Sequence, residues 1–179
     1  GLDGVYAMRH PYGCSQLGDD LANMRDLTAA LVNHPNAGGV LVVGLGCETN
    51  QISSVQQALG AWDPARVRFY NTQEVGDELA LGARLLAELA EHARRAVRTE
   101  VSMEHLTLGL KCGGSDAFSG ITANPLIGRM ADRAVDCGGT ALLTEVPEMF
   151  GAETRLMERA ADENVYRDIV ELINSFKRY

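Results

Sequence analysis

A lysine, a cysteine, two glycines, a serine and an aspartate follow one another in the stretch LKCGGSDAFSGITANP, residues 110–125. A thiolate or a carboxylate can bind a metal ion or act as a base, a lysine can hold an anion, and glycines let a backbone approach a ligand closely. The stretch ends in Asn124-Pro125, which predicts a helix with Asn124 as its N-cap. Such a helix N-terminus would face the same anion, so the stretch indicates a site for a small anionic ligand.

The elements that must position this stretch alternate along the chain. Five short apolar runs predict strands at residues 4–8, 39–44, 67–70, 106–110 and 140–144, and the second is apolar throughout, as in a strand buried on both faces. Helical patterns lie between and after them, near residues 21–31, 53–59, 76–97, 124–138, 152–161 and 165–176. The alternation predicts an α/β fold, a Rossmann-like three-layer sandwich with a mostly parallel five-stranded sheet. We expect residues 1–179 to form a single α/β domain.

Polar residues follow every predicted strand. In strand order they are Arg9, His10 and Cys14; then Cys47 and Glu48; then Asn71, Thr72 and Glu74; then Lys111, Cys112, Ser115 and Asp116; and last Glu145 and Glu148. The carboxyl ends of parallel strands share one edge of a sheet, where α/β proteins bind their ligands. We therefore expect the site at this edge.

Composition excludes several classes of function. The formal charge of −8 argues against nucleic-acid binding and against attachment to a membrane surface. No apolar run approaches the roughly 18 residues of a membrane span, and no signal peptide is present, so a cytoplasmic protein with free thiols is expected. None of the four cysteines belongs to a CxxC pair, which argues against a zinc ribbon. No GxGxxG motif follows the first strand, which argues against a nucleotide-binding module.

Four segments together resemble a known family. They are RHPYGC (9–14), HPNAGGVLVVGLGCE (34–48), LKCGGSDAFSGITANP (110–125) and GGTALLTEVPEMFGAE (138–153). They resemble the altronate dehydratase / D-galactarate dehydratase family of sugar-acid dehydratases, over essentially the whole chain. The resemblance implies a hydro-lyase, a carbon–oxygen lyase that depends on ferrous iron and removes water from an aldonate or aldarate to give a 2-keto-3-deoxy acid. It also implies that this chain is the central domain of a longer enzyme, with the other domains of that enzyme as partners, and a homo-oligomer is expected.

This reaction requires a base for the proton next to the carboxylate, an acid for the departing hydroxide and positive charge for the enediolate. Imidazole, thiolate and carboxylate groups all suit a first-row transition metal. We expect His10, Cys47, Glu48 and Cys112 as metal ligands, with Cys14 as a further member of the pool. A single Fe2+ is preferred, and an iron–sulfur cluster remains the alternative.

The remaining roles follow from the same chemistry. We expect Lys111, Asp116 and Glu145 as catalytic residues, and Arg9, Gly113, Gly114, Ser115 and Asn124 as substrate-binding residues. Structural alternatives stay open: Cys112 as a small buried residue, Lys111 as a surface lysine, Asp116 as a turn cap and Glu145 as an ion-pair partner. Glu148 is interpreted as a surface residue.

The predicted function is a dehydratase of the galactarate or altronate type acting on a small anionic sugar acid. Two alternatives remain. One is a sulfolactate sulfo-lyase on the same scaffold, which also belongs to the family. The other is an inactive fragment that binds an anion or mediates subunit contact.

Overall fold

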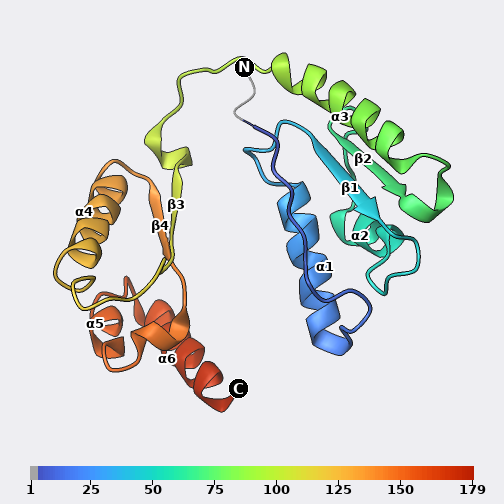
Figure 1. The fold of residues 1–179 in the computed structure, drawn as a ribbon. Coiled ribbons are helices and arrows are strands. Elements are labelled where there is room, and N and C mark those ends of the chain that lie inside the picture. The colour runs from blue at the N-terminus through green and yellow to red at the C-terminus, as the bar shows by residue number, and fades with distance from the viewer. Residues whose placement is uncertain (1–3) are drawn as a thin grey trace. The chain divides into compact units, whose positions relative to one another are not determined.

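The structure is a computed structural model that describes residues 4–179. The chain divides into two compact units, Gly1–Arg98 and Thr99–Tyr179, and each is described by itself (Figure 1). Among the described residues, no helix is both long and apolar enough to cross a membrane.

The first unit is built around two parallel strands. Its elements in chain order are α1 (Gly18–Val32), β1 (Val40–Gly44), α2 (Ile52–Leu59), β2 (Val67–Asn71), the short 3-10 helix η1 (Thr72–Glu74) and α3 (Glu78–Arg94). β1 and β2 pair in parallel from Val40 opposite Val67 to Gly44 opposite Asn71. The two strands therefore end side by side, and the loops that leave them start at the same edge.

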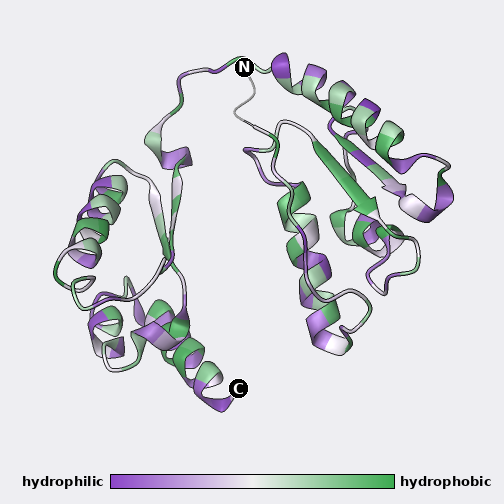
Figure 2. Ribbon diagram, viewed as in Figure 1, coloured by the Kyte–Doolittle hydropathy of each residue, from purple (hydrophilic) through white to green (hydrophobic). Residues whose placement is uncertain are grey.

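Apolar side chains from both helices and strands form the core of this unit. Ala29 and Val32 of α1, Leu59 of α2 and Val67 of β2 are buried together. β1 is apolar along its length, whereas β2 includes polar residues (Figure 2). The helix ends are fixed locally: the Asp77 side chain accepts a hydrogen bond from Ala80 N at the start of α3, and Gly60 ends α2 with a positive φ of 72°.

The second unit repeats the arrangement. It contains η2 (Met103–His105), β3 (Thr107–Leu110), α4 (Ala123–Asp136), β4 (Thr140–Leu143), η3 (Val146–Met149), α5 (Glu153–Met157) and α6 (Glu163–Arg178). β3 and β4 pair in parallel from Thr107 opposite Thr140 to Leu110 opposite Leu143. Their carboxyl ends are therefore also adjacent.

The turn after β4 is held by aromatic packing against α6. The ring of Phe150, directly after η3, lies edge-on to Phe176 with centroids 6.2 Å apart, and Lys177 Nζ lies 5.1 Å above the Phe150 ring. The side chain of Asp162 caps α6 by accepting from the backbone N–H groups of Asn164 and Val165. These contacts hold η3, which carries Glu148, against α6.

The predicted Rossmann-like three-layer sandwich with a five-stranded sheet is wrong. Four of the five strands are present and pair in parallel, but they form two sheets of two strands each. Residues 4–8 form no strand, and Val5, Tyr6 and Met8 are exposed. β1 is not buried on both faces either, because Val43 is 49% exposed. An apolar run indicates that a strand tends to be buried, but it does not determine how many other strands pair with it. The single domain of residues 1–179 stays a prediction.

Candidate functional site

The loop after β3 carries the stretch that the sequence singled out. Lys111 Nζ donates a hydrogen bond to the carbonyl oxygen of Cys112 at 2.8 Å. The sulfur of Cys112 lies 3.6 Å from Ser115 Oγ, within reach of a weak hydrogen bond. The backbone N–H of Cys112 donates to Glu145 Oε2 at 3.0 Å. One side chain from the end of β4 therefore holds the loop that follows β3.

Glu145 adopts an unusual backbone conformation. Its φ and ψ are 67° and 70°, and it is the only non-glycine residue with positive φ in the described part of the chain. The left-handed region costs a residue with a Cβ atom roughly 1–2 kcal/mol, and such strain concentrates at functional sites. The turn directs the chain from β4 into η3, where Glu148 N donates back to Glu145 O at 2.9 Å.

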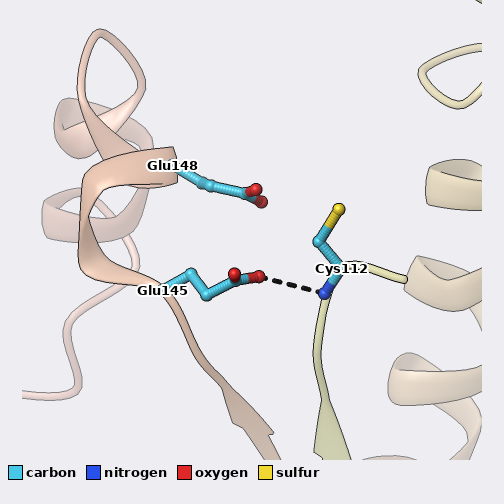
Figure 3. Close-up of side chains that lie close together, drawn as sticks. All are labelled: Cys112, Glu145 and Glu148. Carbon is cyan, nitrogen blue, oxygen red and sulfur yellow. Dashed lines mark hydrogen bonds between the residues drawn. The ribbon is translucent and has the colours of Figure 1, made fainter. Parts of the chain in front are cut away.

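These turns bring three potential metal ligands together. Cys112 Sγ and carboxylate oxygens of Glu145 and Glu148 all lie within 4.8 Å of one another. Both glutamate side chains point toward Cys112 (Figure 3). We call these three residues the Cys112 cluster. Within residues 4–179 it is the one group of three His, Cys, Asp or Glu side chains that meets this distance.

Asp116 is engaged with its own loop. Its Oδ1 accepts from Phe118 N at 2.7 Å and from Ser119 N at 3.0 Å, while Ser119 Oγ accepts from Asp116 N at 3.2 Å. This reciprocal pattern is that of a turn cap. The geometry therefore fits the structural alternative for Asp116 better than a free catalytic carboxylate.

Asn124 is not the N-cap of α4. The helix begins at Ala123 with Thr122 as N-cap, so Asn124 and Pro125 are its second and third residues. The prediction failed because proline is tolerated throughout the first turn of a helix, where its missing N–H has no intrahelical partner. Asn124 N donates to Ser119 O at 2.8 Å, which closes the loop against the helix.

Gly113 and Gly114 border open space. A Cβ atom at either position would meet no heavy atom within 4 Å, so packing does not require glycine at either position. Lys111 is exposed on the same loop. The loop therefore leaves room beside Cys112 for a ligand.

In the first unit, the loop after β1 is anchored by Glu48. Its Oε1 accepts from Leu45 N at 2.9 Å and its Oε2 from Gly46 N at 2.6 Å. Burial raises the pKa of Glu48, but backbone N–H groups of residues 45–48 together lower it by more, so the pKa lies below its ordinary value. Both carboxylate oxygens thus serve the loop itself.

Cys47, beside Glu48, is exposed, and its sulfur accepts a hydrogen bond from Gln73 Nε2 at 3.2 Å. The segment around Cys14 lies against this loop, since Cys14 Sγ is 3.7 Å from Cys47 O and Thr49 Oγ1 donates to Cys14 O at 3.2 Å. The two thiols therefore belong to neighbouring segments, although residues 4–8 before Cys14 form no strand and the predicted shared sheet edge is absent.

Arg9 and His10 lie in the irregular segment that precedes α1. His10 Nδ1 is buried without a hydrogen-bond partner, and its ring stacks on Tyr12 at 6.4 Å. Arg9 is exposed. Neither joins a group of three close donor atoms among the described residues.

The structure thus brings together Lys111, Cys112, Ser115 and Glu145 at the end of β3 and β4. Sequence reasoning placed Glu148 after the last predicted strand and interpreted it as a surface residue, and it is exposed, but its closeness to Cys112 was not predicted. Sequence reasoning missed Gln73, which contacts Cys47. Glu148 follows Glu145 by three residues in the run TEVPEM, and that spacing was the one signal that could have paired them.

Two family models cover nearly the whole chain. One, described as the second domain of D-galactarate dehydratase/altronate hydrolase, matches residues 1–94. The other, described as the C-terminal part of D-galactarate/altronate dehydratase, matches residues 103–179. The chain belongs to the D-galactarate/altronate dehydratase family. The boundary between the two matched regions falls where the chain divides into its two compact units.

Named relatives agree with this assignment. An altronate dehydratase of Bacillus subtilis is 53% identical over 99% of this chain, and one of Escherichia coli is 49% identical over 100% of it. A galactarate dehydratase (L-threo-forming) of Escherichia coli is 35% identical over 82% of the chain and 30% of its own length. The chain spans 36% of the length of each altronate dehydratase. No solved structure matches it.

Proposed function

We propose that this chain is part of a sugar-acid dehydratase that removes water from an altronate- or galactarate-type substrate to give a 2-keto-3-deoxy acid. The observation that carries the proposal is the identity of 53% and 49% to two altronate dehydratases across 99% and 100% of the chain. The identity to the galactarate dehydratase is lower, at 35%. Altronate is therefore the first substrate to test. The other parts of a longer protein are the partners of this chain in the proposal.

The chemistry determines what the site must supply. The substrate is an anion and the chain carries a net charge of −8, so local groups must attract the carboxylate. Lys111 is exposed beside the open glycine pair, and we assign it to the substrate carboxylate. Asp116 and Ser119 hold the later part of this loop in shape through their mutual hydrogen bonds.

The family resemblance implies ferrous iron, and the Cys112 cluster fits such an ion. One thiolate and two carboxylates are donors that a borderline transition metal accepts. When bound, Fe2+ would polarise the substrate carboxylate and stabilise the negative charge that develops as the neighbouring proton leaves. Iron–sulfur clusters are held by several thiolates, whereas this group contains one cysteine, which supports a single ion. Cys47 and His10 stay predictions as ligands.

The test uses the longest protein that contains this chain, purified without oxygen and supplied with Fe2+. We expect keto acid to form from altronate, and formation of sulfite from sulfolactate without dehydration of either sugar acid would overturn the proposal. In Lys111→Gln we expect kcat/KM to fall about 10- to 100-fold, since a hydrogen bond to a charged group contributes about 1.5–3 kcal/mol. Arg155→Gln, at an exposed residue paired with Glu158, is the matched control and should keep its activity.

A further inference from the structure

We infer that Cys112, Glu145 and Glu148 form a three-ligand centre for one divalent transition-metal ion, built entirely within residues 99–179. The inference deepens the proposed function, because it names the ligands of the ion that the dehydration would use. It also reassigns two residues: Glu145 changes from a catalytic residue to a ligand, and the exposed Glu148 becomes a ligand as well.

The charges of the Cys112 cluster are not balanced by the protein. Among the described residues, no Lys or Arg forms an ion pair with Glu145 or Glu148, which is also true of many other acidic side chains of the chain. The nearby ammonium group of Lys111 donates to the carbonyl oxygen of Cys112. Two carboxylates and a thiol placed this close together form a set of donors that a divalent cation can bind.

The distances suit a shared ion. Bonds from a transition metal to thiolate sulfur and carboxylate oxygen are roughly 2.0–2.3 Å long, so two donors on one ion lie at most about 4.5 Å apart. The three donor atoms here lie within 4.8 Å of one another. This spread is close to that limit, and the Glu148 side chain is exposed and not packed in place.

The backbone around the Cys112 cluster is already set. Glu145 is held in its left-handed turn, and one of its oxygens accepts from Cys112 N, which leaves the other oxygen for an ion. Glu148 lies on η3, which is fixed by the packing of Phe150 against Phe176. Cys112 is half-buried, with Ser115 Oγ as a weak partner of its sulfur. Three donors from two strand ends therefore converge without a rearrangement of the chain.

The donor types define the class of ion. A thiolate favours Fe2+, Co2+ or Zn2+ over Mg2+ and Ca2+, which prefer sites made of oxygen alone. Three protein ligands are fewer than such an ion takes, so substrate oxygens can complete its coordination. Co2+ is the appropriate probe, because cobalt bound to a thiolate absorbs in the near ultraviolet through charge transfer from sulfur.

The experiment titrates the reduced, metal-free chain with Co2+ in the absence of oxygen. We expect one Co2+ per chain, a charge-transfer band, and no displacement by excess Mg2+. Cys112→Ser should abolish the band, and Glu145→Gln and Glu148→Gln should each weaken binding at least about 10-fold. Each replacement preserves the size of the side chain, and circular dichroism checks that the variants fold. Cys137→Ser and Glu158→Gln, at exposed positions outside the cluster, are the matched controls and should bind like the original chain.

Three results would overturn the inference: no Co2+ binding, a band that survives in Cys112→Ser, or a band that is lost in Cys14→Ser or Cys47→Ser instead. These results are distinct from a failure of the proposed function. If a longer protein dehydrates altronate while the three variants bind Co2+ normally, the ligand assignment is wrong and the function stands. If the cluster binds Co2+ as described and no sugar acid is dehydrated, the function is wrong and the metal centre stands.

Discussion

Replacing Glu48 by glutamine tests whether this carboxylate anchors its loop or binds a metal. Its two oxygens accept from Leu45 N at 2.9 Å and Gly46 N at 2.6 Å. In Glu48→Gln, one oxygen becomes an NH2 group that faces a backbone donor, so one hydrogen bond to a charged group is lost. Such a bond contributes about 1.5–3 kcal/mol, and we expect the free energy of unfolding at pH 7 to fall by about 2 kcal/mol.

The pKa of Glu48 determines how the loss of stability in Glu48→Gln should change with pH. The pKa of Glu48 in the folded chain lies below the unfolded value of 4.5, so its ionised form stabilises the fold. This stabilisation is fully present above the unfolded pKa and is lost as the pH falls through the folded pKa. The difference in stability between the original chain and Glu48→Gln should therefore be largest near neutral pH and shrink below pH 4.5.

The assay is urea unfolding, followed by circular dichroism, at several pH values between about 3 and 7. Glu88→Gln, at an exposed residue with an ion pair to Arg84 at 4.0 Å, is the control and should change stability by less than about 0.5 kcal/mol. A Glu48→Gln effect that does not vary with pH would refute the electrostatic reasoning. The same variant should bind Co2+ normally, and a loss of binding would restore Glu48 as a metal ligand.

Three other substitutions test the backbone and the caps by denaturant unfolding. Gly139→Ala should lose about 1–3 kcal/mol, because its Cβ would lie 3.0–3.2 Å from three backbone carbonyl oxygens, whereas Gly128→Ala on open α4 surface should gain about 0.5–1 kcal/mol. Asp162→Ala should lose about 1 kcal/mol with the N-cap of α6. Glu145→Gly should be more stable than Glu145→Ala by about 1 kcal/mol. Both variants remove the carboxylate, but only glycine removes the backbone strain of the left-handed conformation at this position. Equal stabilities of the two variants would argue against a left-handed conformation here.

Local pattern was sufficient for most of the secondary structure. The strands predicted at residues 39–44 and 67–70 agree with β1 and β2 to within one residue at each end. Short apolar runs bounded by turn residues are typical of buried strands, so the sequence pattern was sufficient here. The pairing of the strands into sheets could not be predicted from the sequence, since it depends on contacts between residues far apart in the chain. The first apolar run, residues 4–8, has the composition of a strand and yet forms none.

The site residues also divide into those that the local sequence could identify and those whose position depends on contacts between distant parts of the chain. The stretch from Lys111 to Ser115 could be singled out from its residue types alone, and Cys112 lies in the cluster that the structure forms. The closeness of Glu148 to Cys112 could not be predicted, because it depends on the direction in which the chain leaves β4. That direction is set by a left-handed glutamate, at a position where sequence rules would look for glycine.

Glu145 connects the ends of β3 and β4 through both its backbone and its side chain. Its backbone turns the chain so that Glu148 faces Cys112, and its side chain accepts the Cys112 N–H and so fixes the loop after β3. A glycine at this position would make the turn with less strain but would remove the bond that joins the two strand ends. The strain at Glu145 is therefore best explained by its carboxylate, which holds Cys112 in place and which, in the metal centre proposed above, also supplies a ligand.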